Sequence, residues 1–105
     1  MTDTLHGVAT KKVVGGKLLR VKTVLREDKI ESAQLTGDFF MHPEDFVGKI
    51  EEALGGLPAK SSVEEFTKVV AASVMNNAIE LIGISPQDIA ETLIASIQDA
   101  TGAIS

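Results

Sequence analysis

Hydrophobic and polar residues alternate with a period of two over residues 17–26. This spacing is typical of a β-strand that buries one face and exposes the other. The exposed face of this segment carries basic side chains, namely Arg20, Lys22 and Arg26. The opposite positions are expected to face the core, and they are Leu19, Val21, Thr23 and Leu25.

A second alternating segment covers residues 30–40 and follows the polar residues Glu27, Asp28 and Lys29. Two alternating segments that flank a short polar turn predict an antiparallel hairpin. The residues expected on one face of the second strand are Ala33, Leu35, Gly37 and Phe39.

The first predicted helix follows this hairpin. His42 is placed at its cap and Pro43 at its first position, where the missing N–H of proline costs nothing. One apolar stripe then runs to Leu54, and Gly55–Gly56 is expected to end the helix.

Two further helices begin at recognisable caps. Ser62 and Glu65 have the spacing of a capping box, and Ser85 precedes a proline that suits a first helical position. Gly102 is expected to end the last helix. The short apolar stretch of residues 79–84 is predicted to be a third strand, although a continuation of the second helix fits the same residues.

These elements predict an α+β fold, in which a small antiparallel sheet (the hairpin and a possible third strand) packs against three helices. Residues 1–10 show no periodicity and are expected to form a flexible tail. Residues 11–105 are expected to form a single domain, because a chain of 105 residues suits one hydrophobic core.

The composition narrows the chemistry of this domain. The chain has no cysteine, which excludes disulfides, thiolate metal sites and cysteine nucleophiles. It has four phenylalanines and no tryptophan or tyrosine, so the core must be mainly aliphatic. No secretory signal or membrane span is recognisable, and a cytoplasmic location without membrane attachment is expected.

Charge is distributed unevenly along the chain. Residues 1–35 contain seven Lys and Arg against four Asp and Glu, whereas residues 36–105 contain three against eleven. The formal net charge is −5. Nucleic-acid binding is not expected, because the net charge is negative and no aromatic side chain lies among the basic residues to stack on bases.

No motif predicts catalysis or metal binding by this chain. Gly15-Gly16-Lys17 lacks the length and the Ser or Thr of a phosphate-binding P-loop, and a strand follows it instead of a helix. The two histidines, His6 and His42, would need a carboxylate such as Glu44 to bind zinc, and a capping role suits His42 better. We therefore expect no catalytic residue and no metal.

The segment Asp38-Phe39-Phe40 concentrates half of the phenylalanines beside Gly37. Adjacent residues of a strand point to opposite faces, so Phe39 and Phe40 cannot both face the core. One of them is expected to contact either a partner or the first helix.

Several segments resemble the C-terminal accessory domain of lipoate–protein ligases. The similar segments lie in the same order over most of the chain, and they are Gly15-Gly16-Lys17-Leu18, Thr36-Gly37-Asp38-Phe39-Phe40, the helix that ends at Gly55–Gly56, and residues 81–89. Each motif is short, so the resemblance depends on their order and spacing.

The resemblance implies a non-catalytic accessory subunit of a two-component ligase. The catalytic subunit of such a ligase would use lipoate and ATP, form lipoyl-adenylate, and lipoylate a lysine of an acceptor domain. This chain would bind no cofactor alone and would form a heterodimer with the catalytic subunit. Its expected interface residues are Lys12, Gly15, Gly16, Lys17, Asp38, Phe39 and Phe40.

Two other functions fit the sequence. One is a stand-alone protein-interaction adaptor that has no link to lipoate. The other is a small-molecule binding protein that uses a cleft between the sheet and the helices.

Overall fold

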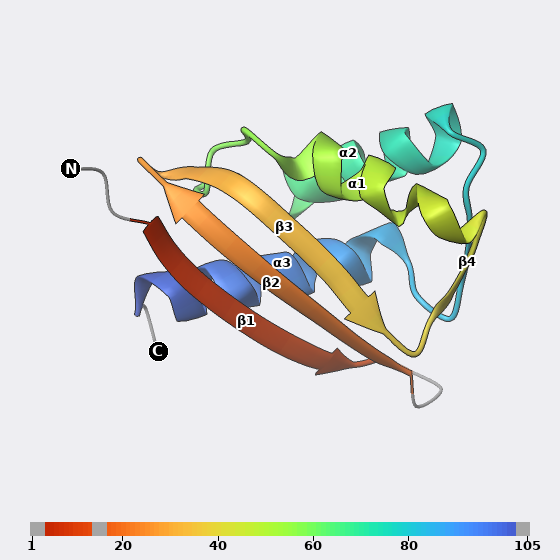
Figure 1. Cartoon of the computed structure of the whole chain (residues 1–105), viewed down its shortest axis with the longest axis horizontal. Helices are drawn as coiled ribbons and strands as arrows, with labels where there is room; N and C mark the ends of the chain where they lie inside the picture. The colour runs from red at the N-terminus through yellow and green to blue at the C-terminus, as the bar shows by residue number, and fades with distance from the viewer. Residues whose placement is uncertain (1–3, 14–16, 103–105) are drawn as a thin grey trace.

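The computed structural model describes residues 4–13 and 17–102, and within them the chain forms two sheets and three α-helices (Figure 1). The first sheet has the order β1 (Thr4–Lys12), β2 (Leu18–Arg26) and β3 (Lys29–Gly37), and the second pairs β4 (Phe40–His42) with β5 (Glu80–Ile82). The helices are α1 (Val47–Leu54), α2 (Val63–Asn76) and α3 (Pro86–Thr101). The predicted α+β class is confirmed.

Strand β1 corrects the prediction of a flexible tail for residues 4–10, and residues 1–3 lie outside the described residues. It pairs antiparallel with β2 along its whole length, from Thr4 opposite Arg26 to Lys12 opposite Leu18. The small residues Gly7 and Ala9 occupy inward positions of this strand, so the segment lacks the alternation of large apolar residues that identifies a strand in a sequence.

The predicted hairpin is formed by β2 and β3. Its turn residues, Glu27 and Asp28, have φ angles of 53° and 64°, as both central residues of a two-residue hairpin turn of type I′ do. All positions predicted to face the core from β2 are buried, and Ala33 and Leu35 of β3 join them.

The chain leaves the first sheet at Gly37, which corrects the prediction of one strand over residues 30–40. Gly37 has a φ angle of 151°, and a Cβ atom there would lie 2.1 Å from the carbonyl oxygen of Leu18. The backbone therefore bends at a position that only glycine accommodates. Phe40 then starts β4, which pairs with β5 in a second sheet.

The residues around 79–84 form a strand and do not extend α2. β5 lies antiparallel to β4, with Met41 opposite Leu81. Asn77 ends α2, and Ala78 adopts a left-handed conformation with a φ angle of 51° before the strand begins.

The predicted capping boxes are present, whereas the first helix starts later than predicted. Ser62 caps α2 with Glu65, and Ser85 caps α3 with Asp88. His42 is the last residue of β4 instead of a helix cap. A short 3-10 helix, η1 (Glu44–Phe46), precedes α1.

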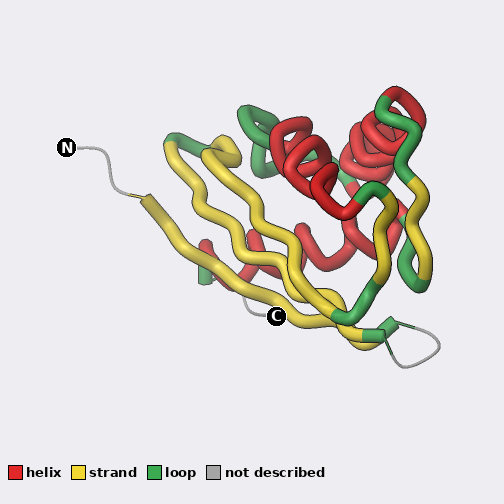
Figure 2. The backbone as a smooth tube through the Cα atoms, turned by 45° about the vertical axis from the view of Figure 1, so that its right-hand side comes forward, coloured by secondary structure: helices red, strands yellow, loops and turns green. Residues whose placement is uncertain are grey.

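The helices lie on one side of the three-stranded sheet (Figure 2). α3 packs against β1 and β2, α1 packs against β3, and α2 packs against α1 and α3. The core between these layers is aliphatic around a fully buried Phe66. Its fully buried large aliphatic residues are Leu19, Val21, Ile30, Ile50, Leu54, Val70, Ile89 and Leu93.

In both edge strands of this sheet, a backbone N–H group donates a hydrogen bond to a carboxylate of a helix. The N–H of Val8 in β1 donates to Asp99 Oδ2 at 2.9 Å, and the N–H of Leu35 in β3 donates to Glu51 Oε2 at 2.8 Å. Backbone donors that are already bonded cannot pair with another strand, so these contacts protect the edges from intermolecular pairing.

An ion-pair cluster also joins β1 to the start of α3. Lys11 Nζ donates to Glu91 and lies 3.6 Å from Asp88 Oδ1. The hydrogen bonds from Lys11 and Gln87 lower the pKa of Glu91, and the bond to Glu91 raises the pKa of Lys11. The three side chains are only partly buried, so water screens the ion pairs and the cluster contributes more to the position of β1 than to stability.

Candidate partner interface

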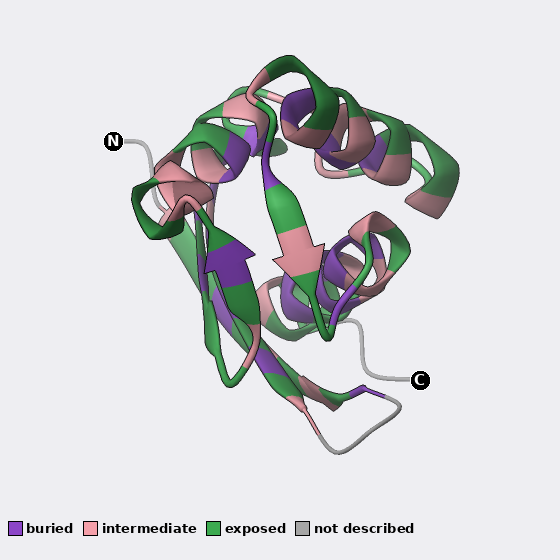
Figure 3. Ribbon diagram, turned by 90° about the vertical axis from the view of Figure 1, so that its right-hand side faces the viewer, coloured by how far each residue is buried: buried purple, intermediate pink, exposed green. Residues whose placement is uncertain are grey.

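The ribbon of β4 and β5 exposes two large apolar side chains side by side. Phe40 is directly opposite Ile82, and these side chains are 60% and 49% exposed. Met41 is buried, and Leu81 packs against the core from the opposite face of the ribbon. Figure 3 shows β4 and β5 next to each other, with the exposed positions in green. Strand alternation therefore forces Phe40 and Ile82 outward.

Lys17 is held beside this exposed pair. Its Nζ lies 5.2 Å from the centroid of the Phe40 ring, within the range of a cation–π interaction. Its aliphatic stem lies over Gly83, where a Cβ atom would be 3.1 Å from Lys17 Cγ. The absence of a side chain at Gly83 thus gives room to the lysine, and the lysine in turn supports the aromatic ring. We call Lys17, Phe40 and Ile82 the aromatic ridge.

The aromatic ridge stands between two surface hollows of about 320 and about 590 Å³. Phe40, Met41 and Glu44 line both hollows, and Asp45 and Ile82 line the larger one. An exposed aromatic side chain between hollows, with charged groups around it, has the composition that protein interfaces favour. The ridge is therefore suited to insert between side chains of a partner.

The structure divides the predicted interface residues between two faces. Lys17 and Phe40 lie together in the ridge, and Asp38 is exposed close by, its backbone N–H bonded to the carbonyl of Leu18 at 2.9 Å. Phe39 packs against the core, as expected for one of two adjacent aromatics. Lys12 lies across from Leu18 on the outer face of the sheet. Gly15 and Gly16 lie outside the described residues.

Sequence reasoning missed Ile82 and Gly83. The short apolar stretch of residues 79–84 predicted a strand, but such a short strand does not identify its partner. The pairing with β4 is a contact between residues about forty positions apart, and it alone places Ile82 beside Phe40.

The described residues contain no group of three or more His, Asp and Glu side chains placed to hold a metal ion. Over the same residues, no helix has the length and apolar character needed to cross a membrane.

Two comparisons with known proteins point to the same kind of protein. No family model matches the chain. It is 31% identical over 91 residues to lipoate-protein ligase A subunit 2 of Thermoplasma acidophilum, and the match covers 86% of this chain and 92% of that relative. Among solved structures, it is similar to a chain from an archaeal lipoylation system of the same organism, described as a bipartite lipoate protein ligase and its E2 lipoyl domain. That similarity has a TM-score of 0.64 and 26% identity, and it covers 89% of this chain and 97% of the other.

Proposed function

This chain belongs to the family of lipoate-protein ligase A subunit 2, and from this membership we propose that it is the non-catalytic accessory subunit of a ligase made of two polypeptides. The match over nearly the full length of both proteins is the observation that carries the proposal. The order of the segments Gly15–Leu18, Thr36–Phe40 and 81–89 in the sequence supports the same assignment.

The partner is a catalytic lipoate–protein ligase subunit that binds lipoate and ATP. In this scheme the catalytic subunit forms lipoyl-adenylate and transfers the lipoyl group to a lysine of an acceptor domain. The accessory chain promotes formation of the adenylate by docking on the catalytic subunit and holding it in a productive conformation. The cysteine-free composition suits a heterodimer in the reducing cytoplasm.

The aromatic ridge is the proposed docking surface for the catalytic subunit. Phe40 combines a large exposed apolar area with a contact to Lys17 that restricts its ring, so less conformational entropy is lost on binding. Ile82 extends the apolar area, and Glu44 and Asp45 supply a polar rim. Interfaces commonly concentrate their binding energy in a few central, well-packed residues, and aromatic side chains are enriched at interface centres.

Replacing Phe40 with alanine is expected to raise the Kd for the catalytic subunit at least about tenfold, equivalent to about 1.4 kcal/mol. The reason is the loss of apolar contact area at the centre of the interface. Isothermal titration calorimetry measures the change, and a thermal melt of the isolated chain shows whether the variant is folded.

The matched control is Met75→Ala. Met75 is an exposed apolar residue of α2, 80% exposed and outside the aromatic ridge. This variant is expected to bind within about twofold of the parent, as surface residues outside an interface do. A folded Phe40→Ala chain that binds as tightly as the Met75→Ala chain would contradict the proposed docking surface.

A further inference from the structure

The outer face of the three-stranded sheet is a second surface, separate from the aromatic ridge. The helices pack on the inner face (Figures 1 and 2). Most outward side chains of β1, β2 and β3 are exposed. Lys17 belongs to the ridge, and the next residue, Leu18, points to the outer face opposite Lys12. The two surfaces can therefore contact different partners.

This outer face is basic, whereas the protein as a whole is acidic. Its exposed cations come from all three strands, and we call them the basic face: Lys12, Arg20, Lys22, Arg26 and Lys29. Glu31 is the one acidic residue in the three strands, and it pairs with Arg26 at 2.8 Å. The formal net charge of the chain is −5, so its negative charge lies mainly outside this sheet.

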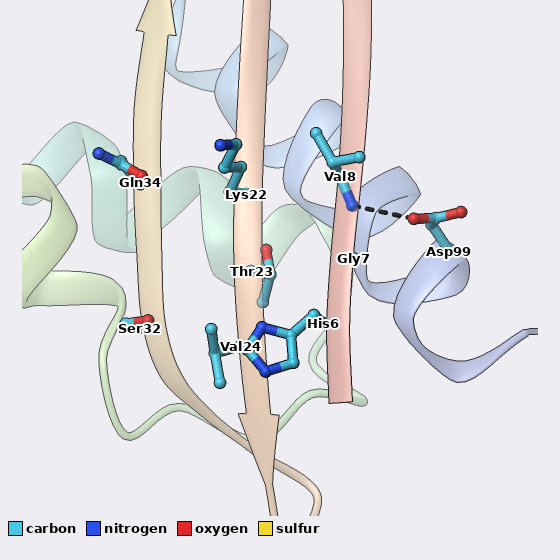
Figure 4. Close-up of a pocket in the computed structure, with 9 residues that line it drawn as sticks. All are labelled: His6, Gly7, Val8, Lys22, Thr23, Val24, Ser32, Gln34 and Asp99. Carbon is cyan, nitrogen blue, oxygen red and sulfur yellow. Dashed lines mark hydrogen bonds between the residues drawn. The ribbon is translucent and has the colours of Figure 1, made fainter. Parts of the chain in front are cut away.

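A shallow hollow of about 310 Å³ lies within the basic face. Two adjacent rows of residues cross the strands there. Val8, Lys22 and Gln34 form one row, and His6, Val24 and Ser32 form the next (Figure 4). Valine side chains from two strands thus provide a small apolar floor, with His6, Lys22 and Gln34 around it. Asp99 of α3 also lines the hollow, and its carboxylate accepts the hydrogen bond from the N–H of Val8. Such a floor can accept an apolar side chain of a partner whose remaining contacts are acidic.

The charges of this face suit rapid and reversible association. Exposed cations contribute more to the rate of encounter with an acidic partner than to the stability of the complex. The related archaeal system comprises the bipartite ligase and an E2 lipoyl domain. Of these components, the acceptor domain is the one that must bind and leave in every reaction cycle.

We infer that the basic face binds an acidic surface of the acceptor domain and guides that domain to the catalytic subunit. This inference rests on the proposed function, because it requires that the chain be part of a lipoate–protein ligase. A nucleic acid is a less suitable occupant, since the three strands that form the outer face carry no Phe, Tyr or Trp side chain for stacking.

The test is the double charge reversal Arg20→Glu and Lys22→Glu in the reconstituted ligase, with the unlipoylated acceptor domain as substrate. At about 0.01 M salt we expect the KM for the acceptor to rise about tenfold, because steering contributes ten- to a thousandfold to association. At about 1 M salt the parent and the variant are expected to converge, because the Debye length falls to about 3 Å. Pyrophosphate release without acceptor is expected to stay at the parental rate.

The matched control is Lys60→Glu with Lys68→Glu, which changes the net charge by the same amount. Both lysines are exposed and lie outside the sheet. This control is expected to raise the KM by a smaller factor than the reversal on the sheet, because its charges lie farther from the bound acceptor and Coulomb attraction falls with distance. The inference is overturned if a folded Arg20→Glu/Lys22→Glu chain leaves the KM unchanged, or if both double variants raise it equally.

A third outcome would also overturn the inference while leaving the proposed function in place. If the reversal on the sheet weakens binding to the catalytic subunit and slows pyrophosphate release, the basic face belongs to the subunit interface. By contrast, failure of the parental chain to promote pyrophosphate release at all would contradict the proposed function itself.

Discussion

Replacing Gly7 with alanine is expected to destabilise the fold by about 3 kcal/mol or more, at or beyond the upper end of the usual cost of overpacking. A Cβ atom at this position would lie 2.0 Å from the carbonyl oxygen of Ser96 and 2.5 Å from the backbone nitrogen of Ala100. Both are backbone atoms of α3, so no side-chain rotation can relieve the contact. The helix would have to move away from β1.

Movement of α3 would also disturb a buried hydrogen bond between α3 and β2, close to Gly7. Thr23, which lies opposite Gly7 in β2, shares a hydrogen bond of 2.5 Å with Ser96 of α3. Both hydroxyl-bearing residues are almost fully buried. If α3 moved outward, these hydroxyls would lose their mutual bond inside the core, which adds to the cost of the steric contact.

Gly48→Ala provides the control for this prediction. Gly48 lies in α1, and a Cβ atom there would meet no atom within 4 Å. Alanine within a helix, where its side chain meets no obstacle, stabilises a protein by roughly 0.5–1 kcal/mol relative to glycine. Urea unfolding of both variants measures the difference, and a Gly7→Ala chain as stable as the parent would show that α3 does not lie so close to β1.

The sequence correctly predicted the helices and strands that are marked by residues close together in the chain. The alternation in residues 17–26 identified the buried face of β2, because a half-buried strand repeats every second residue. The caps at Ser62 and Ser85 fixed the starts of α2 and α3, because a capping side chain bonds to the backbone only three residues away.

The strands and strand pairings that sequence reasoning missed depend on contacts between residues far apart in the chain. β1 gave no periodic signal because its two central inward residues, Gly7 and Ala9, are small, and at Gly7 the backbone of α3 leaves no room for a side chain. β4 and β5 contain three residues each, and their pairing depends on the return of the chain after α2. The exposure of one of two adjacent phenylalanines was predictable from alternation, whereas the neighbouring Ile82 was not.

The central claim is that this chain promotes adenylate formation by a separate catalytic subunit. The direct test measures pyrophosphate release from ATP and lipoate. It uses a catalytic lipoate–protein ligase subunit of the same organism that lacks an accessory domain of its own. We expect addition of this chain to accelerate release about 100-fold, the scale on which a correctly positioned active site differs from a misplaced one. The acceleration should reach its plateau when this chain and the catalytic subunit are equimolar. Without the catalytic subunit, this chain should release no pyrophosphate.

Two additions to this assay make its outcome specific. The Phe40→Ala chain should need a higher concentration to reach the same plateau, because the substitution weakens docking and leaves the conformation of the complex unchanged. The Met75→Ala chain should match the parent. Equal pyrophosphate release by the catalytic subunit with and without this chain, or release by this chain alone, would contradict the account.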